Sequence, residues 1–470
     1  MSLIFQLPRI LEESKKEYEK IRASAELKRP FVSVEKKDVR GVSEGSVLAR
    51  GDNLDFMKYL LDDQSMEGKL QLVYMDPPFY SKASYDAVIK LKSPDVEEVP
   101  AMKPEAYDDH WKTGMEDYLR MLCIRFYLIR DLLSDEGCFW VHLDWHVVHY
   151  VKILLDEIFG ENNFVNEVIW NYKSGGTGKR NFSRKHDTLL FYSKSKKYYF
   201  NPLQEKSYNR GFKPYRFKGV KEYKDDLGWY TMVNMKDVWQ LDMVGRTSAE
   251  RTGYATQKPE TLLSRIIESC TREGDLCADF FSGSGTLAAA AEKLGRRWIA
   301  CDVGGIATAS CLKRMSVKQS VFTVLEQMPD GMDYADTDQE GPVLMQKPNS
   351  QKDELTVGVS VEPVEFTDKQ LVTISLQGYH MDMKHVPVQG KDREIIKKFR
   401  RKDSLQLLEY WSVDFNYNGI IHTPQFVFTK DNHNIEKICQ QLIDSATPHL
   451  ISIRAVDVFG NSTLKVAEVY

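Results

Sequence analysis

Residues 276–302 read LCADFFSGSGTLAAAAEKLGRRWIACD, and this stretch decides the fold class. The apolar runs 276–281 and 298–301 predict two strands, and 287–294 predicts a helix between them. The glycine loop SGSGT joins the first strand to the helix, and the second strand ends at Asp302. A strand, a glycine turn, a helix and a strand ending in an acid form the unit of a doubly wound α/β sheet, whose ligands bind at the carboxyl ends of its strands.

The glycine loop is suited to a nucleotide-like ligand. Gly283 and Gly285 permit a tight turn and let a ligand approach the backbone, and Ala288 lets the helix pack on the strand. The loop therefore matches G-x-G-x-x-A, the dinucleotide fingerprint, in which Asp302 would bind ribose hydroxyls. It has no G-K-[ST], which argues against a triphosphate-binding P-loop. A nucleotide or nucleoside cofactor is predicted.

A second strand runs into an unusual turn at 71–82, which read QLVYMDPPFYSK. Asp76 places a carboxylate at the carboxyl end of the strand, and the two prolines after it prevent a helix from following. Phe79 and Tyr80 are then large rings on an exposed turn. The residues alone also fit a tight turn that happens to carry aromatic side chains.

Asp52 and Asp144 also follow predicted strands, so several acids are expected along one carboxyl edge. His142 and His146 flank Asp144 and suggest a metal site. Packing at the strand end and solvent-facing roles are the favoured interpretation of these two histidines, and no metal is predicted.

Composition bounds the class of protein. The chain has 470 residues, 42% hydrophobic and 28% charged, with a formal net charge of −4, which suggests two to four folding units. Its seven cysteines are scattered without C-x-x-C spacing, which argues against a disulfide framework or a zinc site and favours a reducing cytoplasm. No apolar run approaches the roughly 18–20 residues of a membrane span, and 1–22 is unlike a secretory signal.

The pattern along the chain predicts four regions. A long irregular stretch at 80–112 is interpreted as either a functional loop or a disordered segment. The regions are an N-terminal helical arm at 1–45, an α/β domain at 46–320, a linker at 321–354 and a β-rich domain at 355–470.

Residues 173–250 are locally basic, with about 17 Lys and Arg against 8 Asp and Glu, and aromatic residues are interleaved among them. Basic charge neutralises phosphates and flat rings stack on unpaired bases, so this insertion is expected to bind nucleic acid. Lys179, Arg180 and Arg184 are candidate contacts. The same composition also fits a solvated, lysine-rich insertion.

Taken together, the motif order DPPF, basic insertion, QKP and F-x-G-x-G resembles the β class of S-adenosylmethionine-dependent DNA amino-methyltransferases, which is circularly permuted and includes modification subunits of restriction systems. The resemblance covers roughly 47–315 and extends to GDNLDFMKYL, HDTLLFYSKS and GYATQKPETLLSRII. It implies a Rossmann-like, doubly wound, mixed but mostly parallel sheet with a basic target-recognition insertion. A sandwich-like, all-β C-terminal module is expected beside it.

The resemblance also implies roles for particular residues. Asp76-Pro77-Pro78-Phe79 would be the catalytic tetrapeptide, in which the Asp76 carboxylate and the Pro77 carbonyl accept hydrogens of an exocyclic amine and Phe79 stacks on a flipped-out base. Such a mechanism needs no covalent intermediate. Residues implied to bind S-adenosylmethionine are Asp52, Lys258, Pro259, Phe281, Gly283, Gly285, Thr286 and Asp302.

Two positions depart from the common family pattern: Phe79 replaces a frequent Tyr, and Phe280 stands where proline is usual. The Asp of DPPF favours adenine N6 over cytosine N4, where the family more often has Ser. Cytosine-N4 methylation, an RNA substrate and a non-catalytic nucleic-acid-binding subunit stay open. A dehydrogenase would leave DPPF and the basic insertion unexplained.

The expected substrate is double-stranded DNA in a prokaryotic cytoplasm, at the nucleoid. The sequence leaves open a homodimer and a restriction or helicase partner. It does not indicate the recognition sequence, the role of the C-terminal module, or whether methylation serves defence or regulation.

Overall fold

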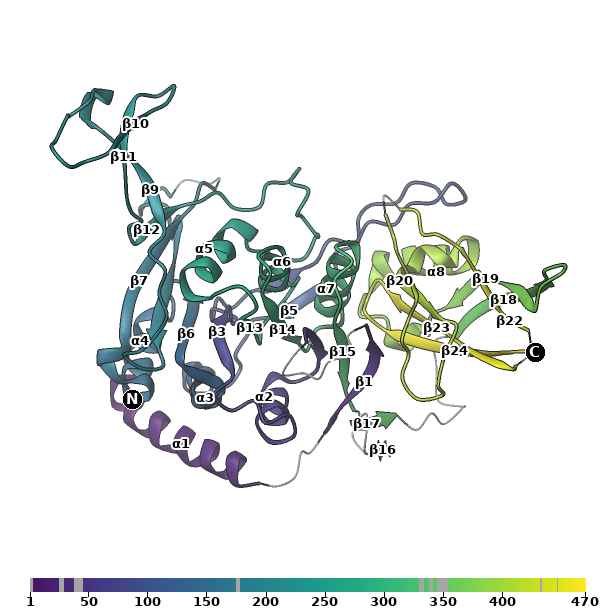
Figure 1. Cartoon of the computed structure of the whole chain (residues 1–470). Coiled ribbons are helices and arrows are strands. Elements are labelled where there is room, and N and C mark those ends of the chain that lie inside the picture. Colours follow the sequence, from purple (N-terminus) through teal and green to yellow (C-terminus); the bar gives the residue numbers. More distant parts are fainter. Residues whose placement is uncertain are drawn as a thin grey trace.

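A ten-stranded sheet forms the centre of the protein in the computed structural model, which describes residues 3–24, 29–37, 45–174, 178–328, 334–337, 341–344, 354–431, 433–445 and 447–470 (Figure 1). Its strands run in parallel from β15 to β6. Strand β1 is antiparallel to β15, β8 is antiparallel to both β6 and β7, and β12 is parallel to β7. The predicted mixed, mostly parallel sheet is therefore confirmed. The order is β1 (Phe31–Lys36), β15 (Thr323–Gln327), β2 (Val47–Arg50), β14 (Arg297–Asp302), β13 (Leu276–Asp279), β3 (Leu70–Met75), β6 (Leu133–Leu143), β8 (His186–Ser193), β7 (Phe164–Asn171) and β12 (Val238–Gln240).

Helices cover both faces of this sheet, as a doubly wound fold requires. The first face carries α1 (Leu7–Ala23), α2 (Asn53–Asp62), α3 (Met115–Leu132) and α4 (Val148–Leu155). The short helix η1 (Leu3–Phe5) precedes α1, and the short helices η2 (Asp156–Gly160) and η3 (Glu161–Asn163) follow α4. The second face carries α5 (Glu260–Cys270), α6 (Thr286–Lys293) and α7 (Gly305–Val317). Among the described residues, no helix is both long and apolar enough to span a membrane.

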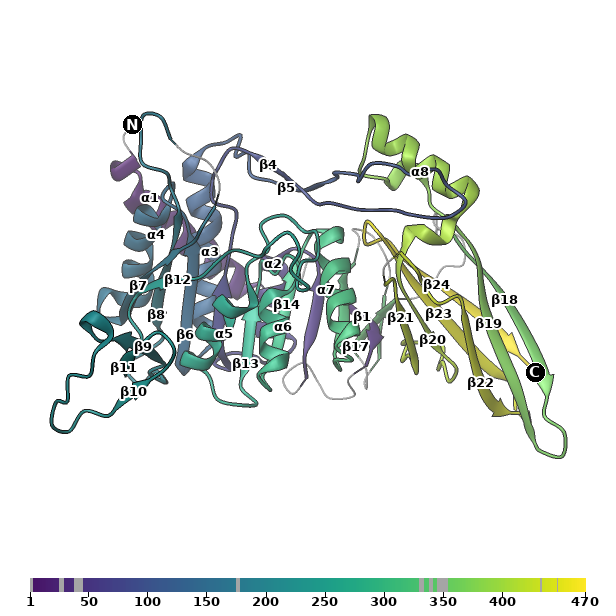
Figure 2. The ribbon, with the colours of Figure 1, turned by 90° about the horizontal axis from the view of Figure 1, so that it is seen from above.

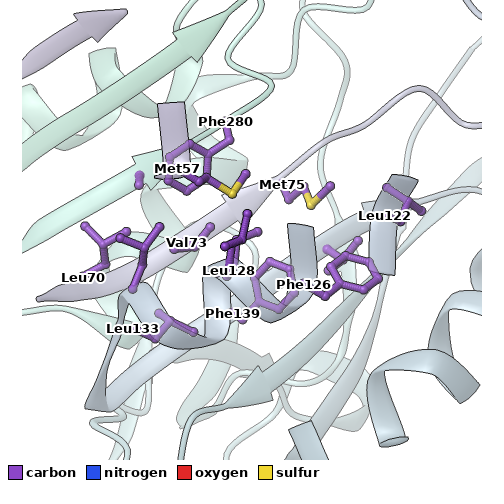
Figure 3. Packing of buried hydrophobic residues seen from close by; sticks show 14 of the residues in the cluster. Met57, Leu70, Val73, Met75, Leu122, Phe126, Leu128, Leu133, Phe139 and Phe280 are labelled. Atoms are coloured by element: carbon purple, nitrogen blue, oxygen red, sulfur yellow. The ribbon is translucent and has the colours of Figure 1, made fainter. Parts of the chain in front are cut away.

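Strand β3 shows why the sheet is buried on both sides. All six of its residues are buried, and successive side chains point to opposite faces. Val73 and Met75 pack with α2 and α3 in one core (Figure 3), whereas Leu72 and Tyr74 pack in the other. A strand of a parallel sheet therefore reads as a continuous apolar run. Phe280 lies in the first core against Phe56, at a ring-centroid distance of 6.4 Å, so it has a packing role where the family has proline.

The sheet order brings distant segments together. Strand β13 lies between β14 and β3 and is parallel to both, with Cys277 opposite Leu72 and Asp279 opposite Tyr74. The glycine loop that follows β13 and the turn that follows β3 therefore leave the sheet at neighbouring strand ends, although some two hundred residues separate them in the chain.

Both ends of the α/β region extend beyond the predicted limits. The expected helical arm 1–45 contains strand β1, which pairs with β15, and β15 lies inside the expected linker 321–354. Two short paired strands, β16 (Tyr334–Thr337) and β17 (Gly341–Leu344), also lie in that linker. These strands of four to six residues carry too few alternations for a periodic pattern, and their pairing partners are remote in sequence.

The C-terminal region contains two antiparallel sheets that share one core, including Val372, Trp411 and Ile453. One sheet has β18 (Glu354–Pro363), β19 (Lys369–His380) and β22 (Ile438–Asp444); the other has β21 (Phe426–Thr429), β20 (Leu408–Asp414), β23 (His449–Asp457) and β24 (Ser462–Val469). The all-β prediction missed α8 (Gly390–Lys402), flanked by η5 (Met383–His385) and η6 (Ser404–Leu407). Helix α8 buries Ile395, Ile396 and Phe399 on this core, but its many charges hid that helical spacing.

Residues 80–112 form an ordered strap between the α/β region and the C-terminal module (Figure 2). Its root is the antiparallel pair β4 (Ser84–Asp86) and β5 (Glu105–Asp108). Apolar residues of its tip, Ile89, Leu91, Val96 and Met102, are buried in the core of the C-terminal module. The strap is therefore ordered by hydrophobic contacts with a region that begins about 250 residues later.

The basic stretch 173–250 does not fold as one unit. Strands β8 and β12 belong to the large sheet. A separate sheet of β9 (Gln204–Tyr208), β10 (Glu222–Lys224) and β11 (Trp229–Asn234), with the turn η4 (Arg210–Phe212), projects from the molecule at the upper left of Figure 1. Residues 175–177 lie outside the described part of the chain.

Candidate active site

Four carboxylates stand at the ends of four neighbouring strands. Asp76 follows β3, Asp279 and Asp302 are the last residues of β13 and β14, and Asp52 lies two residues beyond the end of β2. Because these strands are parallel, their carboxyl ends meet at one edge. Sequence reasoning named three of these acids and passed over Asp279, because it predicted a strand over 276–281 whereas β13 ends at Asp279.

The two oxygens of Asp76 have different surroundings. Oδ2 accepts a short hydrogen bond from the Lys258 ammonium, which comes from the loop before α5. Oδ1 is buried, and no donor of the described residues is within hydrogen-bond distance of it; the Nδ1 atom of His142 is 4.0 Å away. The Asp76 side chain as a whole is 17% exposed, and its unused acceptor is the buried Oδ1 atom.

His142 lies behind Asp76 in a buried polar chain that sequence reasoning did not foresee. Its Nδ1 is 2.8 Å from the Tyr74 hydroxyl, and its Nε2 is 3.1 Å from Oδ2 of Asp187. The Tyr172 hydroxyl donates to the other oxygen of Asp187 over 3.0 Å. Burial opposes ionisation of Asp187, but the hydrogen bond and charge of His142 outweigh it and lower the pKa of that carboxyl. His146 instead pairs with Asp144, 2.7 Å away.

The turn after Asp76 is held from outside. The Tyr118 hydroxyl donates to the Pro78 carbonyl over 2.7 Å. Tyr80 has a left-handed φ of +60°, and its N–H and that of Ser81 donate to the buried carboxylate of Asp109 over 3.1 and 2.6 Å. Left-handed backbone is unfavourable for a side chain of this size, so these contacts fix a strained turn. Asp109 belongs to the strap, and it was not predicted.

Phe79 lies beside two residues that surround the Asp76 carboxylate. Its ring is 5.8 Å from that of His142, with 33° between the planes, and the Lys258 ammonium is 5.3 Å from its centroid. The ring is only partly buried. An aromatic face, a cation and a buried acceptor therefore surround the same point.

The glycine loop is closed by Asp302. Its two oxygens accept from Gly283 N–H and Gly304 N–H, both over 2.8 Å. Burial raises the pKa of Asp302, although both hydrogen bonds oppose the shift. Gly285 has a φ of +73°, and a Cβ there would lie 2.3 Å from the Cys311 sulfur, so only glycine fits.

Other predicted cofactor residues lie around this loop. The Thr286 hydroxyl donates to the carbonyl of Lys258 over 3.3 Å, and Pro259 caps α5. The Phe281 N–H donates to Asp279 over 3.0 Å. Burial raises the pKa of Asp279 well above its usual range, and the charges of Asp76 and Asp302 act in the same direction.

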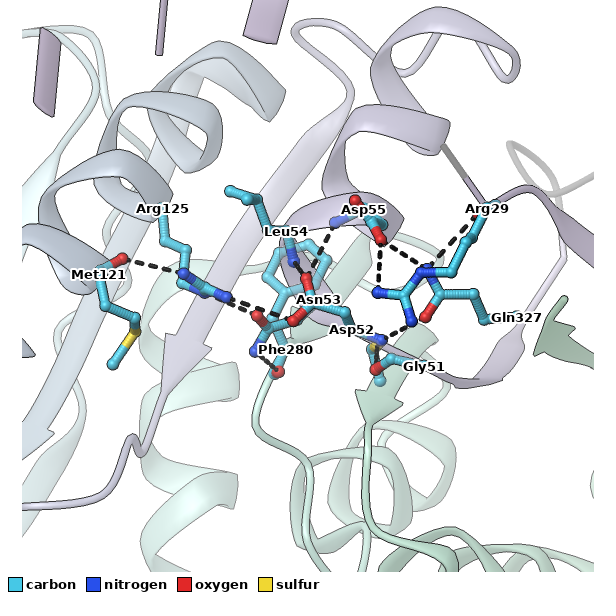
Figure 4. Close-up of polar contacts among 11 residues, drawn as sticks. Arg29, Gly51, Asp52, Asn53, Leu54, Asp55, Met121, Arg125, Phe280 and Gln327 are labelled. Carbon is cyan, nitrogen blue, oxygen red and sulfur yellow. Dashed lines mark hydrogen bonds and ion pairs between the residues drawn. The ribbon is translucent and has the colours of Figure 1, made fainter. Parts of the chain in front are cut away.

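Asp52 begins α2 at the next strand end (Figure 4). Its Oδ1 accepts from Leu54 N–H over 2.8 Å, and the buried Arg125 guanidinium is 3.7 Å from Oδ2. Asn53 accepts from Arg125 over 2.6 Å and donates to the Phe280 carbonyl over 2.7 Å. Arg125 and Asn53 were not predicted, and they tie the Asp52 turn to the glycine loop segment.

The loop fits a polar, nucleoside-like ligand. The Ser282 hydroxyl within it is buried and has no hydrogen-bond partner among the described residues, so it offers a donor and an acceptor at the strand edge, as the free oxygen of Asp76 offers an acceptor. Around these two atoms stand glycines that allow close approach and carboxylates that suit ribose hydroxyls or a cationic group. The donor set thus agrees with S-adenosylmethionine.

The candidate DNA contacts Lys179, Arg180 and Arg184 are exposed on the loop between β7 and β8. The Arg184 guanidinium lies 3.8 Å from the centroid of Trp145, which is 44% exposed and follows Asp144. This contact places the basic loop beside the carboxyl edge. Phe182 at its tip is 99% exposed.

Comparison with known proteins gives a family match. The model of the N6/N4 methyltransferase family, described as DNA methylase, matches residues 70–305, which is half of the chain. Type II methyltransferase M.EcaI of Enterobacter cloacae is 26% identical over 355 residues, or 61% of this chain and 75% of the relative. Type II methyltransferase M1.MboII of Moraxella bovis is 28% identical over 260 residues, or 51% and 87%.

Solved structures are similar over a comparable part of the chain. The M1.HpyAVI–SAM complex matches with a TM-score of 0.37 and 18% identity, covering 57% of this chain and 98% of that one. The PvuII DNA methyltransferase, described as cytosine-N4-specific, matches with a TM-score of 0.39 and 14% identity, covering 60% and 88%.

Proposed function

This chain belongs to the N6/N4 family of DNA methylases, and from that membership we propose that it methylates adenine N6 at a specific site in double-stranded DNA. The methyl donor is S-adenosylmethionine. The single observation that carries the proposal is the buried Oδ1 atom of Asp76, an acceptor without a donor, beside the Phe79 ring and next to the glycine loop. A buried acceptor of this kind is suited to an N–H of a ligand.

The reaction needs an amine nitrogen with a localised lone pair. The exocyclic amine of adenine is a poor nucleophile because that lone pair is delocalised into the ring. Two acceptors, Oδ1 of Asp76 and the Pro77 carbonyl, would take the two amine hydrogens and favour a pyramidal nitrogen. S-adenosylmethionine supplies the electrophilic methyl group when bound. Lys258 occupies only Oδ2 of Asp76, which leaves Oδ1 available to the base.

The contacts behind the tetrapeptide hold these acceptors in place. Tyr118 binds the Pro78 carbonyl, and Asp109 binds the two residues after Phe79, so the turn does not need to reorganise when the base arrives. A base inside a duplex cannot reach this edge, which requires the target adenine to leave the helix. Stacking on Phe79 would then offset about 1–3 kcal/mol of the unstacking free energy.

Cytosine N4 is the second candidate, because it is also an exocyclic amine and the family includes both activities. The carboxylate of Asp76 favours adenine, since family members that act on cytosine more often have Ser there. A non-catalytic subunit would have no use for an intact tetrapeptide and glycine loop.

Modification-sensitive sequencing of DNA tests the proposal directly. Cells that express the wild-type chain are compared with cells that express Asp76→Ala. We expect N6-methyladenine at one short motif in the first cells only. N4-methylcytosine at the motif would overturn the adenine assignment and keep the methylase. Purified protein that binds duplex DNA but leaves it unmodified in the presence of S-adenosylmethionine would overturn both.

A further inference from the structure

A polar cavity lies on the C-terminal module, away from the strand ends that carry Asp76, Asp279 and Asp302. It is formed by the end of β19, the last turns of α8 and the start of β18, and it encloses about 450 Å³. We call it the basic pocket. Its lining residues are Thr356, Tyr379, His380, Lys397, Arg400 and Arg401.

The basic pocket concentrates positive charge without carboxylates. None of its lining residues, all of which are in the described part of the chain, is acidic. The Arg400 guanidinium donates a hydrogen bond to Nδ1 of His380 over 3.2 Å, so this contact orients the guanidinium without neutralising its charge. Among the Lys and Arg residues of this lining, all of them described, Lys397 alone has a carboxylate partner, the exposed Glu394 at 2.7 Å. Three Lys and Arg side chains with one carboxylate partner at a single cavity therefore favour the binding of an anion.

Helix α8 as a whole presents the same charge. Its thirteen residues GKDREIIKKFRRK contain seven Lys and Arg and two acids, a balance of +5. Basic residues in the last turn complement the helix dipole, but that dipole amounts to only about half a unit charge. Most of the positive charge on α8 is therefore uncompensated within the described structure.

The acids that could neutralise α8 bind the strap instead. Asp392 in its first turn accepts from the Lys103 N–H over 2.9 Å. Asp403, directly after the helix, accepts from the Ser93 hydroxyl over 2.7 Å. Both contacts hold the helix to the strap and leave its cationic side chains exposed, as Arg401 is, or half-buried, as Lys397 and Arg400 are.

The strap connects this charge to the catalytic edge. Its buried tip lies in the same core as Ile396 and Phe399 of α8, while Asp109 near its other end holds Tyr80 and Ser81. Between them, the Val88 N–H donates to the Gly253 carbonyl over 2.9 Å, in the segment that leads to Lys258. Figure 2 shows the strap and α8 along the same side of the molecule. The basic pocket is thus held in a fixed position relative to the catalytic turn.

We infer that the basic pocket binds backbone phosphates of the DNA whose base is being methylated, on the flank of the target site. This inference rests on the proposed function, because that function brings a polyanion to the same side of the molecule. Phosphodiester oxygens suit two arginines and a lysine, and guanidinium groups bind phosphate in a bidentate manner. The C-terminal module would then contribute to DNA affinity without reading bases.

The test is a triple variant of the full chain, Lys397→Gln/Arg400→Gln/Arg401→Gln. The matched control is Lys391→Gln/Lys398→Gln/Lys402→Gln, which removes the same charge from exposed positions of α8 outside the pocket lining. Dissociation constants for a duplex that carries the methylated motif are measured between about 50 and 200 mM salt. We expect the pocket variant to bind about 10–100-fold more weakly at low salt, with a salt slope shallower by about 2–3. The control is expected to lose no more than a few-fold, and both variants should unfold at the wild-type temperature.

Duplex length provides a second readout. On DNA of about one helical turn centred on the motif, the flank is missing, so the pocket variant should bind like the wild type; on about three turns, it should show the full loss. Inorganic phosphate, titrated by NMR of the His380 ring, distinguishes a free-anion site. Equal losses for the two variants, or a phosphate response without any change in DNA binding, would overturn the inference. Wild-type protein that neither binds nor methylates DNA would instead overturn the proposed function.

Discussion

Two clusters of buried charge show how differently this fold treats ionised groups. The first is the candidate catalytic edge, where Asp76, Asp279 and Asp302 stand at the carboxyl ends of neighbouring strands. The second joins the edge of the large sheet to the C-terminal module around Glu35 of β1. There, Oε2 of Glu35 accepts from Arg454 over 2.7 Å, and Oε1 accepts a short hydrogen bond from the Tyr410 hydroxyl.

Pairing, not burial, separates the two clusters. Burial opposes ionisation of Glu35, yet the charges of Lys37 and Arg454 outweigh it and lower its pKa to about 2. At Asp279 and Asp302, the opposing hydrogen bonds do not outweigh burial, and the pKa values of both carboxyls are raised. Buried charges that are fully paired stabilise a junction, whereas a buried acceptor left without a donor marks a place where a ligand completes the structure.

The largest expected effect comes from removing the unpaired acceptor. Asp76→Ala deletes the oxygen that would meet the target amine, so we expect the methylation rate to fall at least about 10³-fold. Affinity for S-adenosylmethionine, measured by calorimetry without DNA, should stay within a few-fold, because Asp76 is assigned to the base. Methylation that persists in this variant would show that the unpaired acceptor of Asp76 is not needed for the reaction.

The paired cluster should respond in stability instead. Arg454→Met removes a cation that pairs with Glu35 and leaves the Glu35 carboxylate buried. We therefore expect the free energy of unfolding to fall by about 3–5 kcal/mol. Urea unfolding measures this change. Arg272→Met is the control, since Arg272 pairs with Glu136 over 3.1 Å with about half of each side chain exposed, and such pairs contribute about 0–1 kcal/mol. Equal losses would mean that pairing at the junction is no more important than on the surface.

The sequence predicted the strand ends that carry the carboxylates much better than it predicted the junction around Glu35. Strands β2, β3, β13 and β14 appear as continuous apolar runs that end in acids, so the sheet and most carboxylates at its edge were predictable from local pattern. Edge strand β1 has only six residues, and its partners lie some 290 residues away, so no local signal announced it.

Contacts between remote segments explain the other omissions. The ion pair of Lys258 with Asp76 spans 182 residues, and the resemblance had assigned Lys258 to the cofactor. The strap lacks a periodic pattern because its order depends on the C-terminal core, with which Ile89 and Met102 pack. Arg125 and Asp109 are polar residues whose importance arises from burial, which single-sequence reasoning does not supply.

Acid should weaken the junction. Burial lowers the pKa of His422 to about 4, and Ser412 and Ser452 hydroxyls lie 2.8 and 2.7 Å from its ring nitrogens. The pKa of His422 in the folded protein is below its ordinary value of 6.5. The stability that the neutral imidazole contributes is therefore fully present above pH 6.5 and is lost as the pH falls through 4. Between about pH 7.5 and about pH 5, we expect His422 to contribute a loss of about 2 kcal/mol to the free energy of unfolding, measured by urea unfolding of the wild type and a variant that lacks the imidazole.

His422→Gln keeps hydrogen-bonding groups for both serines but does not titrate. Over the same interval, the free energy of unfolding of the wild type should fall by about 2 kcal/mol more than that of His422→Gln, because the other titrating groups are common to both proteins. Glu35 acts only at lower pH, since its contribution is present above the ordinary 4.5 and lost toward 2. An unchanged acid response in His422→Gln would show that the junction does not depend on a neutral imidazole.

The smallest effect has the opposite sign and belongs to the catalytic edge. The raised pKa of Asp279 means that its charge destabilises the folded state at neutral pH; the advantage of the protonated form is present below the ordinary 3.8 and is lost as the pH rises. Asp279→Asn removes the charge and keeps an oxygen for the Phe281 N–H. We therefore expect the free energy of unfolding at neutral pH to rise by about 0.5–2 kcal/mol. We also expect weaker methylation, because the cationic methyl donor loses a nearby carboxylate.

The same substitution at Asp457 provides the control for sign, because burial raises the pKa of this aspartate only to about 6 and four hydrogen bonds favour its ionised form. Asp457 is fully buried and accepts hydrogen bonds from Phe459 N–H, Tyr379 hydroxyl, and the backbone and side chain of Asn461. Asp457→Asn replaces one of these acceptor oxygens with a donor, so the free energy of unfolding should fall by about 1–3 kcal/mol. If Asp279→Asn destabilised the protein as Asp457→Asn does, the carboxylates at the strand ends would be structural. The claim that the two clusters treat buried charge differently would then be wrong.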